Sequence, residues 1–259
     1  MKVLAVVFSV RRGEKPLTLQ MTEEVCRTVE ACWGEGTETE IVTMSEMPVN
    51  ACTGCKTCFS TGICPQDRAD GMGELRKKLM ECDALIVASP VYMVMVSGWC
   101  KNFLDRCASY CHVFSLSGKP CLVLSVTAMS GGQRTADYLS EMMEVMGCAV
   151  AGKLAFQKFD GEGLTVGSEP AKEAVNHAVS ALRDAAENPE KYISERTEQQ
   201  FDELRNVYRR LEVFWTLSGQ KSTWEVETFR AYGYMNAASF RDALKIADGR
   251  RETLERHDL

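Results

Sequence analysis

The sequence predicts an α/β protein in which helices cover both faces of a doubly wound, five-stranded parallel sheet. Two observations predict this fold class. Over residues 1–157, short uninterrupted apolar runs alternate with amphipathic segments, which is typical of strands buried on both faces and joined by helices. The chain has 259 residues, of which 45% are hydrophobic, and this is enough to bury one large core.

The predicted strands are Val3–Ser9, which is a continuous apolar run, and Glu40–Met44, Ala84–Ser89, Cys121–Thr127 and Ala149–Phe156. The predicted helices between them are Thr18–Cys32, Gly73–Cys82, Ser97–Cys111 and Gln133–Met146. In the first helix, Met21, Val25 and Val29 recur at helical spacing, and Gly34 follows as a stop signal. Five strands with intervening helices predict a flavodoxin-like sheet.

The pattern changes after Gly163, so we expect a sheet domain over residues 1–165 and a helical extension over residues 166–259. A helix is predicted at Glu169–Glu187, and a second amphipathic segment carries Phe201, Leu204, Tyr208, Leu211 and Trp215. An aromatic tail follows, with Trp224, Phe229, Tyr232, Tyr234 and Phe240. We expect the extension to pack on the sheet domain or on a second subunit; the alternative is a lid over the active site.

Charge and composition exclude some partners. The formal net charge of −6 argues against nucleic acid, which requires basic patches. The longest uncharged run, Ala84 to Cys100, is short for a membrane span and is interrupted by Ser89-Pro90 and Ser97-Gly98. Twelve cysteines, and an apolar start that reads as a strand rather than a signal peptide, predict a reducing, cytoplasmic location.

Four cysteines lie close together in a loop over residues 50–66: Cys52, Cys55, Cys58 and Cys64. Bacterial ferredoxins hold cubane clusters with a C-x2-C-x2-C run and a further Cys followed by Pro. Here Pro65 follows the last cysteine, so the spacing favours a [4Fe–4S] cluster with these four ligands. A structural zinc site, disulfides and unliganded thiols are the alternatives.

Three loops leave the carboxyl ends of predicted strands, where ligands bind in open parallel sheets. The first, residues 9–18, has hydroxyl groups at Ser9 and Thr18 and the cations Arg11 and Lys15. It opens a helix, and the unpaired N–H groups of a helix N-terminus suit a phosphate.

The second and third loops suit the other end of such a cofactor. Residues 89–97 present apolar and aromatic side chains for a flat ring, at Pro90, Val91, Tyr92 and Met93. Residues 127–133 allow close backbone approach and contain Thr127, Ser130, Gly131 and Gly132. A cofactor with a phosphate at one end and a planar ring at the other, such as FMN, would span all three loops.

Several segments, among them Gly118-Lys119-Pro120 before a strand and then Gly131-Gly132, resemble the iron–sulfur flavoprotein branch of the NAD(P)H-dependent FMN reductase family. Residues 88–92, continued through Val96-Ser97-Gly98 to residues 101–106, are similar to the family's flavin loop and following helix. The cysteine run, followed by Asp67 and Asp70, is similar to the branch's cluster motif. The resemblance covers about residues 1–157. One departure is the start of the phosphate loop, Phe8-Ser9-Val10-Arg11, where the family usually has Gly-Ser-Pro-Arg.

The resemblance implies a role for each matched position. Ser9, Arg11 and Thr18 would hold the FMN phosphate, and Pro90, Val91, Tyr92 and Met93 would line the isoalloxazine ring. Ser130, Gly131 and Gly132 would close the other side of the ring. Tyr92 is the candidate catalytic residue, as a group that orients a substrate. The resemblance also implies a homodimer or homotetramer, reduced by NAD(P)H or by a ferredoxin-type donor.

The sequence thus predicts an FMN and [4Fe–4S] oxidoreductase that converts between two-electron and one-electron transfer. One alternative is an FMN-only, NAD(P)H-dependent reductase of quinones, azo or nitro compounds, with structural or zinc-bound cysteines. A second is an electron carrier without a substrate of its own. A third is an adaptor that has lost its flavin.

Overall fold

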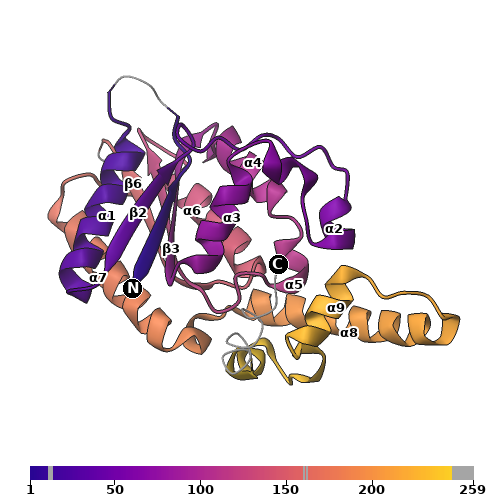
Figure 1. The fold of residues 1–259 in the computed structure, drawn as a ribbon. Helices are drawn as coiled ribbons and strands as arrows, with labels where there is room; N and C mark the ends of the chain where they lie inside the picture. Colours follow the sequence, from indigo (N-terminus) through magenta and orange to yellow (C-terminus); the bar gives the residue numbers. More distant parts are fainter. Residues whose placement is uncertain (11–13, 160, 162, 247–259) are drawn as a thin grey trace.

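The computed structural model describes residues 1–10, 14–159, 161 and 163–246, and Figure 1 shows their arrangement. Arg11 therefore lies outside the described residues. The five long strands are β1 (Lys2–Val7), β2 (Glu38–Thr43), β3 (Ala84–Tyr92), β5 (Pro120–Thr127) and β6 (Ala149–Gln157). They pair in parallel in the order β2-β1-β3-β5-β6. If these five strands are renumbered 1 to 5 along the chain, their order in the sheet is 2-1-3-4-5, as in flavodoxin-like sheets. The doubly wound topology is therefore confirmed.

The predicted number of strands was wrong: over the described residues the sheet has seven. The additional strands are β4 (Met95–Val96), antiparallel to the end of β3, and β7 (Leu164–Thr165), parallel to β6. Each has two residues, and a pair of residues is too short to show the periodicity from which strands are predicted.

Alternate residues of β1 face the two helical layers, as a strand buried on both faces requires. Leu4 and Val6 share a core with α3 (Met72–Glu81), α4 (Gly98–Arg106) and α6 (Gly132–Val145). Val3, Ala5 and Val7 share a core with α1 (Leu17–Trp33) and α7 (Glu169–Glu187). The helix α7 therefore lies beside α1 and completes one layer over the sheet (Figure 1).

The single helix predicted over Ser97–Cys111 is two helices, α4 and α5 (Tyr110–Val113). The carbonyl of Arg106 accepts a hydrogen bond from the Arg76 side chain, and the N–H of Tyr110 bonds instead to the carbonyl of Cys107 at 2.8 Å. The i to i+4 ladder is broken there, so the helix ends.

Three short helices connect these elements: α2 (Thr57–Thr61) inside the cysteine loop, the 3₁₀ turn η1 (Pro65–Arg68) after it, and η2 (Pro189–Tyr192) after α7. Among the residues that the structure describes, no helix is both long enough and apolar enough to cross a lipid bilayer.

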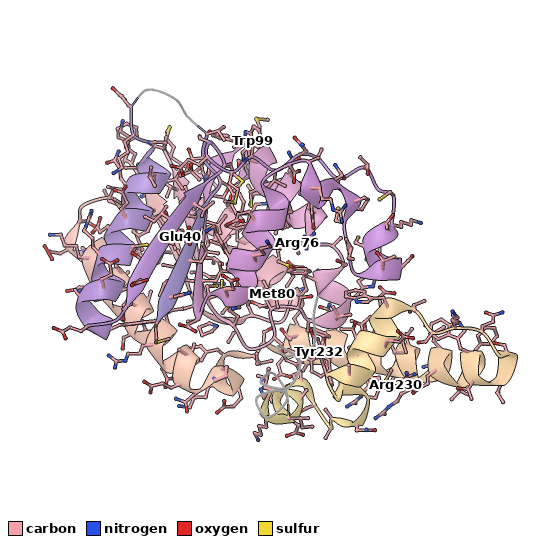
Figure 2. The ribbon with its side chains drawn as sticks, in the orientation of Figure 1. Glu40, Arg76, Met80, Trp99, Arg230 and Tyr232 are labelled. Carbon is pink, nitrogen blue, oxygen red and sulfur yellow. The ribbon has the colours of Figure 1, made fainter. Side chains whose placement is uncertain are left out.

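After α7, which packs on the sheet, the extension continues with α8 (Glu195–Ser218), α9 (Trp224–Ala231) and the 3₁₀ turn η3 (Tyr234–Asn236). Its core is aromatic, with Phe201 stacked on Phe229 at 5.6 Å between ring centroids. Phe114, which follows α5, joins this core through Phe240 at 4.8 Å. Figure 2 shows Arg230 and Tyr232 in this part of the chain, below the sheet.

Candidate functional site

Buried hydroxyl groups join the loops that follow β1 and β3. Ser97 Oγ donates to the carbonyl of Phe8 at 2.8 Å and accepts the N–H of Cys100 at 3.2 Å. The N–H of Ser97 donates to Ser89 Oγ at 3.1 Å. Ser89 and Ser97 are fully buried, so these bonds fix the start of α4 against the carboxyl end of β1.

The loop predicted to hold a flat ring is a hairpin between β3 and β4, with the pairs Val91–Val96 and Tyr92–Met95. Its turn residues Met93 and Val94 have φ angles of 50° and 63°. Two positive φ angles define a type I′ turn, which strongly prefers Asn-Gly. A β-branched residue in this region is strained, and such strain clusters at functional sites.

The third predicted loop lies directly against this hairpin. A Cβ on Gly131 would be 2.7 Å from Cγ1 of Val94 and 3.2 Å from Cγ1 of Val91, and Gly131 itself has a φ of 84°. Only glycine fits this position. Thr127 Oγ1 donates to the carbonyl of Ser130 at 2.8 Å, and Ser125 Oγ donates to that of Gly132 at 2.7 Å, which fixes the loop.

An apolar surface is exposed where these two loops meet. Tyr92 is 50% exposed, Met93 is 95% exposed and Met129 is 74% exposed. Pro90 is buried and Val91 is half-buried. Large apolar side chains held in the open by strained or hydrogen-bonded backbone indicate a binding surface, and this one suits a planar aromatic ring.

The first loop ends at α1, whose N-cap position is Pro16. Proline has no side-chain oxygen to accept from the first-turn N–H groups, and these groups favour an anion. Ser9 and Thr18 are both buried, with exposed fractions of 5% and 3%. Lys15 forms an ion pair with Glu23, so its charge is partly neutralised. The residues present therefore fit a flavin phosphate and ring.

The cysteine loop wraps through three left-handed residues: Gly54, Lys56 and Gly62 have φ angles of 67°, 61° and 75°. The N–H of Gly54 lies 3.4 Å from Sγ of Cys52. Such N–H groups stabilise thiolates and the clusters bound to them.

The thiols of this loop influence one another electrostatically. Burial raises the pKa of Cys58, and negative charge on Cys64 and Cys52 raises it further, against a hydrogen bond with Ser109 that lowers it. Hydrogen bonds with the side chain and backbone of Thr57 lower the pKa of the exposed Cys55. Cys52 and Cys64 thus both lie within electrostatic range of Cys58.

The structure does not, however, gather the four cysteines into a finished site. Across residues 1–10, 14–159, 161 and 163–246, no group of three or more Cys, His, Asp or Glu side chains is placed to hold a metal ion. The donor chemistry fits an iron–sulfur cluster, while the sulfur positions in this conformation are not those of ligands to one centre.

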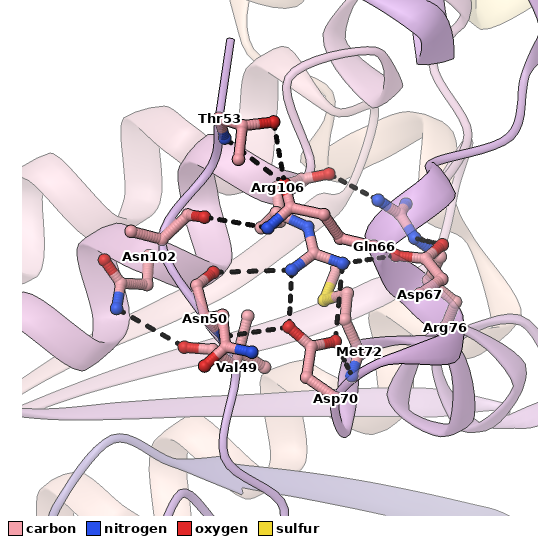
Figure 3. Close-up of polar contacts among 11 residues, drawn as sticks. Val49, Asn50, Thr53, Gln66, Asp67, Asp70, Met72, Arg76, Asn102 and Arg106 are labelled. Atoms are coloured by element: carbon pink, nitrogen blue, oxygen red, sulfur yellow. Dashed lines mark hydrogen bonds and ion pairs between the residues drawn. The ribbon is translucent and has the colours of Figure 1, made fainter. Parts of the chain in front are cut away.

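Both ends of the cysteine loop are held by side chains that sequence reasoning left out of the site (Figure 3). Gln66 Oε1 accepts from the N–H of Thr53 at 3.2 Å, and its Nε2 donates to the carbonyl of Ala51 at 3.1 Å. Gln66 thus joins the residues next to Cys52 to the residues after Cys64.

A buried ion-pair network lies beneath the loop. Arg106 donates to Asp67 at 2.6 Å and to Asp70 at 2.5 Å, and Arg76 Nε lies 2.8 Å from Asp67. The carboxylate of Asp70 also accepts the N–H of Asn50 at 2.9 Å. Figure 2 shows Arg76 between the sheet and the cysteine loop. Arg106 follows Phe103 by three residues on the buried face of α4, and this position was the available signal that its charge is buried.

A hollow of about 420 Å³ lies at the opposite edge of the sheet, between α3 and the first residues of β1 and β2. The ion pair of Lys78 with Glu40, 2.8 Å long, is part of its lining. None of the predicted site residues lines this hollow.

Residues 1–160 match the model of a family described as NADPH-dependent FMN reductase. The chain is 38% identical over 141 residues to an iron–sulfur flavoprotein of Archaeoglobus fulgidus, a match that covers 54% of this chain and 62% of that protein. It is 35% identical over 136 residues to an iron–sulfur flavoprotein of Methanocaldococcus jannaschii, covering 52% and 67% of the two chains. The chain thus spans less than two thirds of the Archaeoglobus protein.

A solved structure shares the fold. The crystal structure of RosB with the bound intermediate 8-demethyl-8-formylriboflavin-5'-phosphate superposes with a TM-score of 0.53 and 19% identity. The superposition covers 73% of this chain and 81% of RosB.

Proposed function

The chain belongs to the NADPH-dependent FMN reductase family, and from that membership we propose that it is an FMN-dependent oxidoreductase with a [4Fe–4S] cluster in its cysteine loop. The observation that carries the flavin assignment is the contact of Gly131 with Val94, which assembles an exposed apolar surface at the carboxyl edge of the sheet. The relatives named iron–sulfur flavoprotein support the cluster.

The proposed flavin-binding residues form two groups, one for the ring and one for the phosphate. Tyr92 and Met93 would line the ring, and the backbone of Gly131 and Gly132 would approach it from the other loop. Ser9, Arg11, Thr18 and the first turn of α1 bind the phosphate, and Lys15 contributes less because of its ion pair with Glu23. Tyr92, half exposed, orients the electron donor or acceptor over the ring.

Cys52, Cys55, Cys58 and Cys64 supply the thiolates for the cluster. Bound FMN takes up electrons in pairs or singly, and a bound cluster passes them one at a time. The hydrogen bonds of Thr57 to Cys55 favour the thiolate form that a metal requires. A homodimer or homotetramer, a cytoplasmic location, and reduction by NAD(P)H or a ferredoxin-type donor belong to the same proposal.

An FMN-only reductase of quinones, azo or nitro compounds is the second candidate. It is favoured by one observation: within the described part of the chain, the cysteines are not gathered into a metal site. An electron carrier without its own substrate would be reduced rapidly by a ferredoxin-type donor and would turn over none of a panel of quinones and nitro compounds.

Replacing Cys55 with Ser separates the first two candidates. Anaerobic NAD(P)H oxidation is measured with a quinone and with a one-electron acceptor. We expect C55S to keep the wild-type rate with the quinone. Its rate with the one-electron acceptor should fall at least about tenfold. The matched control is Cys32→Ser, because Cys32 is also exposed and lies outside the loop. Equal one-electron rates in wild type and C55S would leave the FMN-only reductase.

A further inference from the structure

The extension touches the cysteine loop at one closely fitted point. A Cβ on Gly62 would lie 2.5 Å from both Cε2 and Nε1 of Trp224. Gly62 also caps α2, and its N–H donates to the carbonyl of Cys58 at 3.0 Å. The indole of Trp224, the first residue of α9, therefore rests on the end of the short helix that begins just before Cys58.

A second contact lies one turn away. The Phe59 ring packs on the ring of His112, with centroids 4.8 Å apart. Nδ1 of His112 lies 2.6 Å from Oε1 of Glu225, the residue after Trp224 in α9. The α2 helix is thus held by α9 directly and through α5, and Figure 1 shows α2 lying above α9.

The α5 helix is itself fixed by the extension. The hydroxyl of Tyr208 donates to the carbonyl of His112 at 3.2 Å, and Nε2 of Gln200 donates to the carbonyl of Cys111 at 2.7 Å. A continuous set of contacts therefore leads from α8 and α9 to α2, the helix that carries Cys58.

We propose that the extension positions the cysteine loop, and that Trp224 is a positioning residue that holds α2 and, through it, the loop that carries the thiols. The matched family region ends at residue 160, and α2 has only five residues. A helix of that length is not stable alone, so its geometry depends on what packs against it. The metal-binding part of this inference rests on the proposed cluster; the mechanical part does not.

The mechanical part is tested by a double-mutant cycle on the metal-free protein, with Gly62→Ala, Trp224→Ala and both together. Hydrogen exchange of the peptides covering residues 52–64 is followed by mass spectrometry. Each single variant should exchange about tenfold faster than wild type over residues 57–63, since the helix end loses its cover. The double variant should exchange more slowly than the two single effects combined would predict, because alanine at residue 62 no longer clashes with an indole, while its backbone strain at a φ of 75° remains.

Two further variants keep the test decisive. Phe214→Ala removes an exposed aromatic residue of α8 and should leave the loop unchanged. Glu225→Gln weakens the contact with His112 but keeps the packing of α9, so it should accelerate exchange by a smaller factor. This milder variant tests the proposal even if Trp224→Ala unfolds the extension. Loop exchange that is unchanged in W224A and E225Q, or effects of Gly62 and Trp224 that add independently, would overturn the proposal.

Iron loading tests the metal-binding part. After anaerobic incubation with ferrous iron and sulfide, W224A should hold less than about half of the iron bound by wild type and by F214A. Full loading of W224A would remove the role in metal binding. If wild type binds no iron, the proposed cluster fails, and the exchange measurements alone decide whether Trp224 positions the loop.

Discussion

Arg106 and Asp70 form a buried ion pair: Nη1 of the guanidinium lies 2.5 Å from Oδ2 of the carboxylate, and their side chains are 0% and 2% exposed. The same carboxylate accepts the N–H of Asn50, where the chain enters the cysteine loop, and the N–H of Met72, where α3 begins. This pair therefore connects α4, α3 and the loop that carries the four cysteines (Figure 3).

Arg106→Met should destabilise the protein strongly, because it leaves Asp70 and Asp67 without their shared cation. Breaking a buried pair by removing one partner costs about 3–5 kcal/mol of unfolding free energy. The control is Lys101→Met, which breaks the exposed pair with Asp105 and should cost less than about 1 kcal/mol. Urea unfolding measures the free energy of unfolding of both variants. Equal losses would show that the buried ion pairs contribute no more to stability than the exposed pair.

The same pair predicts a loss of stability in acid. Burial alone would raise the pKa of Asp70, but hydrogen bonds from Arg106 and from the N–H groups of Asn50 and Met72 outweigh it and hold the pKa below its ordinary value. A carboxyl with a lowered folded-state pKa stabilises the fold above its unfolded pKa, and this contribution disappears as the pH falls through the folded value.

This acid effect is measured by unfolding free energies from pH 7 down to pH 2. Wild type should lose stability progressively below about pH 4, which is near the ordinary aspartate pKa. Asp70→Asn should be less stable at pH 7 and should lose less on acidification. A variant that keeps the full wild-type acid dependence would place the titration at other carboxylates.

Gly131→Ala should weaken FMN binding, because the new methyl group would push Val94 and the hairpin away. We expect the dissociation constant for FMN to rise at least about tenfold, measured by quenching of flavin fluorescence. Gly167→Ala is the matched control: its φ of 81° is similar, but nothing lies within 4 Å of the added Cβ. Both variants strain the backbone, so a loss of affinity in both would mean that the hairpin contact is unimportant.

Replacing the turn Met93-Val94 with Asn-Gly should stabilise the protein and reduce its affinity for FMN. The new pair matches the type I′ geometry, and relief of the two positive φ angles is worth about 1–3 kcal/mol. The exposed Met93 side chain is lost from the ring surface. Thermal unfolding and flavin titration measure the two effects, and a variant that gains stability while keeping its affinity would place the ring elsewhere.

The sheet was predictable because its central strands contain apolar runs such as Val3–Val7, and the helices between the strands carry residues such as Val25 at helical spacing. The strands β4 and β7 were not predictable, because each has only two residues and shows no periodicity. The contact of Gly131 with Val94 was only partly predictable: glycine suggested close approach, but Met-Val does not indicate a type I′ turn.

The surroundings of the cysteine loop were the least predictable part. The spacing of Cys52, Cys55, Cys58 and Cys64 indicates a metal, but it contains no information about which distant side chains surround them. Gln66, Arg106 and Trp224 come from three separate elements, and their contacts depend on the tertiary packing. The boundary at residues 165 and 166 and the lid alternative for the extension stay predictions.

The central claim, an FMN site beside an occupied cluster in one chain, is tested most directly by quantifying cofactors after strictly anaerobic purification. The account predicts about one FMN, four iron and four sulfide per chain, with an electron paramagnetic resonance signal after reduction that is lost in Cys58→Ser. Stoichiometric flavin with neither iron nor sulfide, or protein that contains no flavin, would contradict it.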